Sequence, residues 1–290
     1  MTSLETIGLT WLASGQAALR GPLLELSRQC DTAFRTLAGH WQADEEAHPA
    51  TLPAERLQRL DYLHSFPHQA TFPVRMEPSE ANLGDFLDGP ILDDHGVAVT
   101  ELAPIREVLT PAACYHLFSG HEGETLAGPV YLTTRNTCFR QETEYVPLRR
   151  LSSFSMREIV GLGTREEAGD FRDGTRAMVN RFFDLIDLPV VWEIATDPFF
   201  RPRSNPKYLM QRIEPVKHEA VYGGDLAIGS INFHQDHFGA AFAITRDGCA
   251  AYSCCTAFGI ERWLYALTDR HGTDPASWPD LPEAAAKAAG

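Results

Sequence analysis

Apolar residues recur every three or four positions in several stretches of the chain, which is the period of an α-helix with one apolar face. The pattern is clearest in LLELSRQCDTAFRTLAGHW, residues 23–41, and in TREEAGDFRDGTRAMVNRFFDLIDL, residues 164–188. Residues 109–120 and the segment after Gly259 have the same character. We therefore predict helices in these four places, and a mostly helical segment over residues 1–65.

Apolar and polar residues alternate on both sides of the polar segment TEYVP, in PVYLTTRNTCFRQ and in LSSFSMREIVGLG. Alternation with period two predicts β-strands, so we expect these segments to form an antiparallel pair joined by a long loop. Residues 219–247 and 249–257 are expected to add strands, whereas residues 66–99 are punctuated by proline, glycine and aspartate. Because strands and helices do not alternate as βαβ units, we predict an α+β domain built on an antiparallel sheet.

Composition narrows the classes of function. The chain has 290 residues and 44% hydrophobic content, enough apolar surface for one large core. Its 39 acidic and 25 basic side chains give a formal charge of −14, which disfavours general binding to nucleic acid. The N-terminal stretch MTSLETIGLTWLASG lacks the basic residues of a signal peptide and the length of a membrane span, so we expect a cytoplasmic protein. The six cysteines are then expected to be thiols, and the alanine-rich end EAAAKAAG to be frayed.

Charged and aromatic residues gather on the predicted strand pair. Because alternate residues of a strand share a face, Arg140 and Glu142 point the same way, as do Phe154, Met156 and Glu158. One hairpin would thus present an arginine, an aromatic ring and two acids to one cleft. A solvated sheet face with an ordinary ion pair explains the same spacing, and spacing alone favours that interpretation.

A second group lies in CCTAFGIER, residues 254–262. A strand ends there, Gly259 permits a close turn, and Arg262 falls in the first turn of a helix. A cation at the positive end of a helix costs energy unless an anion is bound nearby, and a phosphate would relieve that cost. A solvated surface arginine is the alternative of equal weight.

These two segments resemble motifs 2 and 3 of the class II aminoacyl-tRNA synthetases, in FRxE followed by a loop and RLxxFxxxE, and in AFGIERW. With LDYLHSFPHQATF, LTPAACYHLFSG, EIVGLGT, ATDPFF and SINFHQDHFG, they are similar to the amino acid:[carrier protein] ligases, truncated homologues of methanogen-type seryl-tRNA synthetases. The resemblance runs from about Leu60 to Leu267. It implies one class II catalytic domain over residues 1–290, with N-terminal helices to about residue 60, a helical insertion over about 164–203, and no tRNA-binding domain.

In that family an amino acid is activated with ATP as an aminoacyl-adenylate and passed to the phosphopantetheine thiol of a small carrier protein. The resemblance implies the same activity here, with glycine or alanine favoured as substrate and a homodimer of the motif-1 type. Two alternatives stay open, namely a minimal seryl-type tRNA synthetase and a catalytically silent paralogue that acts as a binding or regulatory protein. The acidic composition counts against the first, and the intact motif residues count against the second.

Roles for the motif residues follow from the resemblance. It implies that Arg140 holds the α-phosphate of ATP and that Glu142 lies beside it at the substrate. Phe154 falls where the family stacks adenine, and Arg262 where the family covers the other adenine face and reaches the γ-phosphate. Since positioning and charge neutralisation carry most of the rate at phosphorus, Arg140, Glu142 and Arg262 are the expected catalytic residues.

The zinc site of the family corresponds to Cys114, Glu158 and Cys255. Three protein ligands with an open fourth position are typical of a catalytic zinc, and the family uses that position for the substrate α-amino group. The resemblance thus implies one Zn²⁺ per subunit. The sequence has no CxxC spacing here, and scattered cysteines are more often small buried apolar residues. Adjacent Cys254 and Cys255 would point to opposite sheet faces, so only one of them is expected to bind metal.

In the segment SINFHQD, four residues are expected to share one strand face, namely Ser230, Asn232, His234 and Asp236, and the segment matches the substrate side of the family. Ser230 and Asn232 are expected to contact the amino acid or the Mg²⁺ that accompanies ATP, whereas His234 is equally well explained as a core histidine. Synthetases of this class place a glutamate shortly before this serine to help hold magnesium, and LAIGS contains none. The candidate replacements among nearby charged residues are Asp225, Lys217 and Glu219.

Arginines outside these positions are candidate contacts as well. The resemblance makes Arg150 a further phosphate contact, and its neighbour Arg149 a second candidate. The segment 164–203 holds six arginines in an otherwise acidic chain, and Arg172 and Arg176 lie one helical turn apart. Carrier proteins are acidic, so this helix is a candidate docking surface, with a solvated face balanced by neighbouring acids as the alternative.

Overall fold

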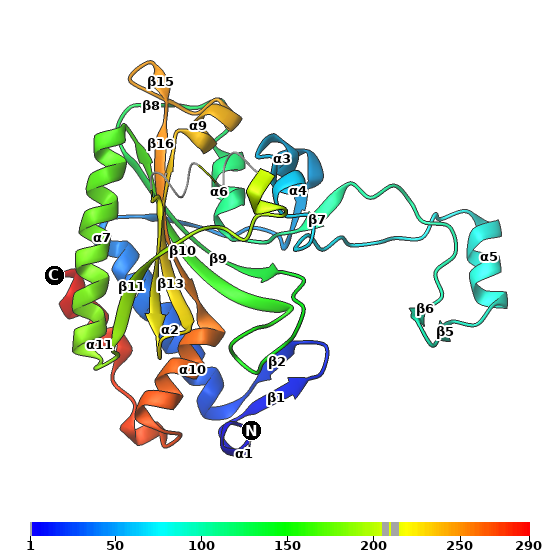
Figure 1. The fold of residues 1–290 in the computed structure, drawn as a ribbon, viewed down its shortest axis with the longest axis horizontal. Helices are drawn as coiled ribbons and strands as arrows, with labels where there is room; N and C mark the ends of the chain where they lie inside the picture. Colours follow the sequence, from blue (N-terminus) through cyan, green and yellow to red (C-terminus); the bar gives the residue numbers. More distant parts are fainter. Residues whose placement is uncertain (1, 205–208, 210–214) are drawn as a thin grey trace.

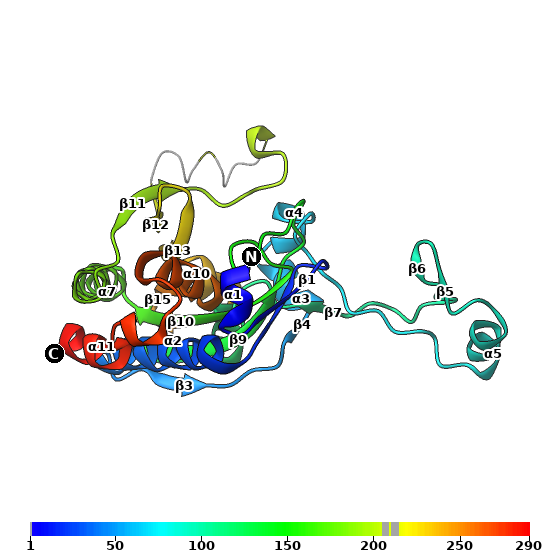
Figure 2. The same ribbon diagram turned by 90° about the horizontal axis from the view of Figure 1, so that it is seen from below.

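The computed structural model describes residues 2–204, 209 and 215–290. Its centre is a seven-stranded sheet, in which neighbouring strands are antiparallel except for the parallel pair β3–β9. In sheet order the strands are β11 (Val190–Ala195), β12 (Lys217–Tyr222), β13 (Leu226–Gln235), β16 (Tyr252–Gly259), β10 (Ser153–Gly163), β9 (Val130–Phe139) and β3 (Asp44–Glu46). Helices flank this sheet (Figures 1 and 2), which confirms the predicted α+β class.

Four helices cover one face of the sheet and build the larger apolar core, namely α2 (Gly21–His40), α7 (Arg165–Leu185), α10 (Ile260–His271) and α11 (Leu281–Ala289). Phe34 of α2 stacks on Phe258 of β16 with ring centroids 4.2 Å apart, and both rings contact Trp263 of α10. Helix α7 begins with a capping box, in which the side chains of Thr164 and Glu167 bind each other's backbone N–H groups. The long helices predicted from apolar periodicity are therefore confirmed.

Shorter helices lie on the opposite face, namely α3 (Ala54–Arg59), α4 (Tyr62–Ser65), α6 (Cys114–Gly120) and α9 (His237–Phe242). A second apolar cluster packs there around the stacked rings of Phe118 and Phe238, whose centroids are 3.8 Å apart. These helices leave part of the sheet face uncovered, and the main cavity of the protein lies over that part.

The first 65 residues are less helical than predicted. They include the elements α1 (Thr2–Thr6), β1 (Leu9–Leu12), β2 (Gln16–Leu19) and β4 (Thr51–Pro53). Gly8 and Gly15 adopt φ values of 115° and 80°, which other residues avoid, so the chain reverses into the hairpin β1–β2. A Cβ on Gly15 would lie 2.4 Å from the ring of Tyr145. The hairpin therefore packs closely against the loop that joins β9 to β10.

Two later segments also differ from the predicted elements. The insertion over about residues 164–203 is not wholly helical, because the chain after α7 forms β11 at the edge of the sheet, and then the 3-10 helix η1 (Pro202–Ser204). The alanine-rich C-terminal segment is an ordered helix, α11, which packs on α2 and α7 with Ala285 and Ala288 fully buried. Small side chains let these helices approach closely, which composition alone does not reveal.

Residues 72–106 form an arm that projects far from the body of the protein (Figures 1 and 2). The arm carries α5 (Glu80–Asp88), β5 (Leu92–Asp93) and β6 (Gly96–Val97), and β7 (Glu107–Leu109) follows it and pairs with β4. The side-chain amide of Asn82 donates to the carbonyls of Glu77 and Glu101, which holds the two sides of the arm together. Large apolar side chains along the arm are exposed, among them Leu87 at 72% and Leu92 at 68%.

The remaining short elements are β8 (Thr125–Leu126), β14 (Thr245–Arg246), β15 (Cys249–Ala250) and η2 (Pro275–Ser277). The two longest helices, α2 and α7, have 20 and 21 residues, but charged residues occur along both. In the described part of the chain, no helix combines the length and the apolar character that are needed to cross a membrane.

Candidate active site

The main cavity has a volume of about 530 Å³ and lies over β10, β12, β13 and β16. Its lining includes most of the residues that the sequence analysis selected, namely Cys114, Arg140, Glu142, Phe154, Glu158, Ser230, Asn232, Cys255 and Arg262. Phe154, Met156 and Glu158 face it from β10, and Ser230, Asn232 and His234 face it from β13. The predicted faces of these two strands are therefore confirmed.

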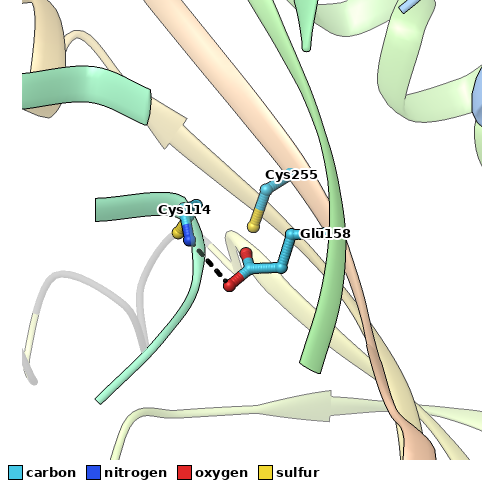
Figure 3. Close-up of side chains that lie close together, drawn as sticks. All are labelled: Cys114, Glu158 and Cys255. Atoms are coloured by element: carbon cyan, nitrogen blue, oxygen red, sulfur yellow. Dashed lines mark hydrogen bonds between the residues drawn. The ribbon is translucent and has the colours of Figure 1, made fainter. Parts of the chain in front are cut away.

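Cys114, Glu158 and Cys255 point toward one another at the wall of this cavity (Figure 3). Their ligand atoms all lie within 4.8 Å of one another, and the three side chains are buried. Glu158 comes from β10, Cys255 from the neighbouring strand β16, and Cys114 from the first residue of α6, where its backbone N–H donates to Glu158 Oε1 over 3.0 Å. Three elements that are distant in sequence thus build one donor group.

The chemistry of this donor group fits a zinc ion. Two thiols and a carboxylate would be costly to bury as anions without a cation. A hydrogen bond to Cys255, burial, and the charge of Glu158 together raise the pKa of the Cys114 thiol well above its usual value, so the metal-free thiol is protonated. Sulfur and oxygen donors suit Zn²⁺, and three protein ligands beside an open cavity are typical of a catalytic site.

His234 lies against this group and is a buried, neutral histidine. Its Nε2 is 3.4 Å from Cys255 Sγ and its Nδ1 is 3.0 Å from the hydroxyl of Ser253, while the rings of Phe118 and Phe238 meet it edge-on. Burial and the nearby His237 lower the pKa of His234 to about 3. The structure therefore places His234 in contact with a candidate metal ligand and within the apolar wall.

Two arginines enter the same cavity without an acidic partner. Arg140 Nε donates to the carbonyl of Pro111, and its guanidinium lies 5.2 Å from the centroid of the Phe154 ring. Arg262, in the first turn of α10, donates to the carbonyls of Arg149 and Ala227, each over 2.9 Å. Burial and the charge of Arg140 lower the pKa of Arg262. Across the described residues neither guanidinium forms an ion pair, so the cavity presents two uncompensated cations to a ligand.

Acidic groups line the same cavity. Glu219 lies opposite Ser230 in the strand register, and Lys217 bridges the carboxylates of Glu219 and Asp197 at 3.3 and 2.8 Å. Glu261 accepts hydrogen bonds from the backbone N–H of Ser155 through both of its oxygens, and burial raises the pKa of this acid to about 7. The cavity thus brings arginines and carboxylates together, a combination that suits a metal–nucleotide complex.

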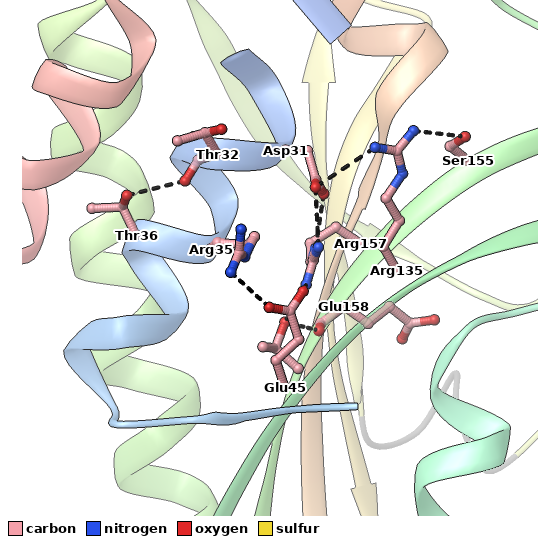
Figure 4. Close-up of polar contacts among 10 residues, drawn as sticks. Asp31, Thr32, Arg35, Thr36, Glu45, Arg135, Ser155, Arg157 and Glu158 are labelled. Atoms are coloured by element: carbon pink, nitrogen blue, oxygen red, sulfur yellow. Dashed lines mark hydrogen bonds and ion pairs between the residues drawn. The ribbon is translucent and has the colours of Figure 1, made fainter. Parts of the chain in front are cut away.

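On the sheet face opposite the cavity, polar residues of β10 and its neighbours form a network of ion pairs (Figure 4). Arg157, which precedes Glu158, points to the opposite sheet face and is 2% exposed. It donates to Asp31 of α2 and to Glu45 of β3 at 2.9 and 2.8 Å. This arginine is fully paired, and it ties α2 and β3 to the strand that carries Glu158.

Four sequence candidates lie outside the cavity. Arg150 pairs with Glu144 at 2.6 Å, and its neighbour Arg149 lines the cavity instead, held by Asp225 at 2.7 Å. Asp225 is occupied by that ion pair and does not line the cavity. The two other candidates, Arg172 and Arg176 of α7, lie on the opposite face of the sheet.

Sequence reasoning missed Asp197 and Glu261. Asp197 lies in ATDPFF, a segment that resembles the carrier-protein ligases but carries no motif of its own. The pairing of Asp197 with Lys217 depends on the tertiary structure. Glu261 directly precedes Arg262, and an acid in the first turn of a helix is ordinarily explained by the helix dipole alone. No local pattern marks it as a buried acid.

Comparison with solved structures defines the class of the fold. The SerRS of M. kandleri, solved in complex with A. aeolicus tRNASec, superposes with a TM-score of 0.81 at 20% identity, covering 98% of this chain and 60% of that one. The prolyl-tRNA synthetase of Cryptosporidium parvum superposes with a TM-score of 0.67 at 12% identity, covering 93% and 50%. At these identities the likeness shows the fold alone, which is the class II aminoacyl-tRNA-synthetase catalytic fold.

Sequence comparison then gives the family. Amino acid--[acyl-carrier-protein] ligase 1 of Bradyrhizobium diazoefficiens is 31% identical over 255 residues, which are 84% of this chain and 77% of that protein. The type-2 serine--tRNA ligase of Methanococcus aeolicus is 25% identical over 260 residues, but the chain spans only 49% of its length. No protein-family model matches the chain. The chain belongs to the family of amino acid--[acyl-carrier-protein] ligases and is a ligase, as the resemblance implied.

Proposed function

We propose that this protein activates a small amino acid with ATP and transfers it to the phosphopantetheine thiol of a carrier protein. The observation that carries the proposal is the meeting of two unpaired arginines and a Cys–Glu–Cys group in one cavity. The first group suits the phosphates of ATP and the second suits a metal-bound amino acid. The names of the similar Bradyrhizobium proteins support the carrier as acceptor.

In the proposed reaction a carboxylate oxygen of the amino acid attacks the α-phosphorus of ATP, and pyrophosphate leaves. Arg140 neutralises the α-phosphate, while Arg262 holds the γ-phosphate side and packs with Phe154 around adenine. Arg149 takes the further phosphate contact that the sequence suggested for Arg150, because only Arg149 lines the cavity. In the second step the carrier thiol attacks the carbonyl carbon, and AMP leaves.

The acidic groups of the cavity are proposed to receive the substrate and the magnesium of ATP. Glu142 and Asn232 line the cavity and are proposed to contact the amino acid, and Ser230 lies beside Glu219. Carboxylates are the ligands that Mg²⁺ prefers, so Glu219 is the proposed replacement for the glutamate missing from LAIGS. Lys217, which is paired with Glu219, would orient it.

Cys114, Glu158 and Cys255 are the residues that would hold zinc, which supplies a Lewis-acidic position for the substrate α-amino group. Cys255→Ala is expected to lose bound zinc and amino-acid activation together, both measured on the same preparation. Cys254→Ala is the matched control, because Cys254 is the next residue and faces the apolar core. If the Cys255→Ala and Cys254→Ala variants bind equal amounts of zinc, Cys255 has no role in holding the metal.

Glycine and alanine are the proposed substrates. The ring of His234 lies 3.4 Å from Cys255 Sγ, and the ring of Phe238 packs against it at 4.7 Å. These side chains restrict the space beside an amino group bound near Cys255. A long substrate side chain would have to displace them.

We further propose that the described fold acts as one cytoplasmic catalytic domain and works as a homodimer. The exposed apolar side chains of the arm support the second point, since such surfaces commonly pack against a partner. The carrier, an acidic protein, is proposed to approach the arginine-rich side of α7 at Arg172 and Arg176. No bound tRNA is expected in this scheme.

The experiment that tests the proposed function is amino-acid-dependent ATP–pyrophosphate exchange, measured with each amino acid on protein of known zinc content. Exchange with glycine or alanine, followed by transfer to a holo carrier protein, is the expected result. Exchange with serine and charging of tRNA would favour the seryl-tRNA synthetase alternative. A folded, zinc-loaded protein that catalyses no exchange would favour the silent paralogue.

A further inference from the structure

A second cavity, of about 380 Å³, lies between α7 and the opposite face of β12 and β13. Because side chains alternate along β12, Lys217 and Glu219 face the active site while His218 faces this cavity. Arg165, Arg172 and Arg176 line it from α7. The function proposed above brings the carrier protein to Arg172 and Arg176 at the rim of this cavity, but assigns no small ligand to the cavity itself.

The arginines form one stripe along α7. Residues 165, 169, 172 and 176 are separated by four, three and four positions, so they lie on the same helix face. Position 169 is a glycine, and a Cβ there would meet no atom within 4 Å. The gap in the stripe therefore adds open space to the cavity between Arg165 and Arg172.

The positive charge of this cavity is only partly compensated. Asp173 is the acid in its lining, and it is engaged by Arg172 over 2.7 and 3.0 Å. Among the residues that the structure describes, Arg165 and Arg176 form no ion pair. Burial and the charges of Arg176 and Arg172 lower the pKa of His218, which shows that its surroundings are positive. This happens in a chain whose formal charge is −14.

Aromatic rings fix two of the guanidinium groups. Arg172 lies over the ring of Phe233 at 5.3 Å from its centroid, and Arg176 lies over the ring of Trp192 at 5.0 Å. A guanidinium stacked on a ring keeps its N–H donors free at its edge. Planar donors in fixed positions suit the tetrahedral oxygens of a phosphate, and lose little entropy on binding.

We propose that this cavity is a binding site for a phosphate group. Its volume exceeds that of one inorganic phosphate, so it also accommodates a phosphoester with a substituent. The two sources of that chemistry are a free anion, such as phosphate or pyrophosphate, and the phosphodiester of a carrier's phosphopantetheine arm. Binding of a free anion does not depend on the proposed ligase reaction. Binding of the phosphopantetheine arm rests on that proposed function.

The position of the cavity favours the phosphopantetheine arm. Val216 and Phe233 belong to the lining of both cavities, and the backbone N–H of Phe233 donates to the carbonyl of Val216 over 2.8 Å. A phosphodiester held by Arg165 and Arg176 would therefore lie next to the wall of the active site. The rest of the arm would extend from there toward the catalytic cavity.

The imidazole of His218 is the local reporter for this proposal. Histidine-labelled protein is titrated with inorganic phosphate at constant ionic strength, and the pKa of His218 is followed by NMR, its signal being assigned with His218→Gln. Binding is expected to raise that pKa in a saturable way, because the anion offsets the nearby guanidinium charges. Arg165→Gln and Arg176→Gln are each expected to weaken binding by about tenfold or more, as loss of a charge-assisted hydrogen bond predicts.

Arg28→Gln is the matched control, since Arg28 is an exposed arginine of α2 in a surface pair with Glu25. It is expected to bind phosphate as the wild type does. An unchanged His218 signal up to about 10 mM phosphate, or equal affinity in wild type and Arg176→Gln, would overturn the proposal. If phosphopantetheine binds more tightly than phosphate and pyrophosphate, the carrier arm is the ligand. If phosphate or pyrophosphate binds more tightly than phosphopantetheine, the ligand is a free anion. ATP–pyrophosphate exchange by the wild-type enzyme is measured in a separate assay. The proposed ligase function and the proposed phosphate site can therefore each be refuted without the other.

Discussion

The arginines on the two faces of the central sheet have different kinds of partner. On the helix-covered face, Arg157 is 2% exposed and donates to two carboxylates, those of Asp31 and Glu45. On the cavity face, Arg140 and Arg262 are half-buried and donate, within the described part of the chain, to backbone carbonyls alone. The first arrangement satisfies a charge within the fold, whereas the second leaves charge available to a ligand. The difference separates a residue that stabilises the protein from residues that bind an anion.

Consecutive residues of one strand also differ in whether they face the apolar core or the cavity. Cys254 packs in the apolar core while Cys255 faces the cavity, and Arg157 and Glu158 divide in the same way. A strand that is covered by helices on one side and by a cavity on the other can therefore serve stability and chemistry at once. Substitutions on the two faces should then have separable effects.

The largest effect is expected for Arg262→Ala. Loss of its guanidinium should lower the rate of ATP–pyrophosphate exchange by about 1,000-fold or more, because a cation that stabilises phosphoryl transfer contributes that much. The midpoint of urea unfolding should shift little, since Arg262 has no carboxylate partner to strand and water in the cavity can bind the carbonyls it leaves. An exchange rate within tenfold of wild type would contradict this assignment.

Arg157→Ala should give the opposite result. It removes the cation between Asp31 and Glu45, but Arg135 stays 3.6 Å from Asp31 and Arg35 stays 2.8 Å from Glu45. The expected loss of unfolding free energy is therefore about 1–3 kcal/mol, the cost of buried polar groups that lose a hydrogen-bond partner. Urea denaturation measures the loss directly. The folded fraction should keep exchange activity close to wild type, and a variant that is stable but inactive would remove the distinction between the two faces.

The pH dependence of the unfolding free energy tests the comparison at a buried acid of the cavity, Glu261. Burial raises the pKa of Glu261 from 4.5 to about 7, and both of its oxygens accept from the backbone N–H of Ser155. The folded protein therefore binds an extra proton between these values, so the stabilising contribution of this group is complete below pH 4.5 and is lost as pH rises through 7. The loss is about 3 kcal/mol, taking 1.36 kcal/mol per pKa unit.

The measurement compares wild type with Glu261→Gln, which carries no titrating group. The difference in unfolding free energy between the two proteins should change with pH across this window and be flat outside it. A difference that is the same at pH 4 and pH 8 would show that Glu261 is ionised in the folded protein throughout.

Much of the fold followed from periodicity. The amphipathic helices α2, α7 and α10 and the pair β9–β10 were predicted because burial on one face leaves a repeating pattern. The hairpin β1–β2 was not, since its turns depend on glycines at positive φ within a sequence that also suits a helix. Helix α11 was missed because alanines are buried there by neighbouring helices.

The site was predictable where residues lie on regular strands. The alternation along β10 and β13 placed Glu158, Ser230 and Asn232 correctly in the cavity. The sequence did not reveal that Arg149 lines the cavity and Arg150 does not, because the loop has no period and Leu148, at φ 59°, reverses the chain just before them. The phosphate contact of Arg150 stays a prediction. Cys114 could be joined to Glu158 only by resemblance, since 44 residues separate them.

The burial of the thiols also makes the protein convenient to label. Five of its six cysteines are buried, and only Cys249, in the short strand β15, is exposed. Thiol-specific dyes react with accessible thiolates, and burial raises the pKa of Cys30, Cys138 and Cys254 further above the working range. A maleimide fluorophore should therefore attach at one position of the unmodified sequence, giving a spectroscopic probe without any engineered cysteine.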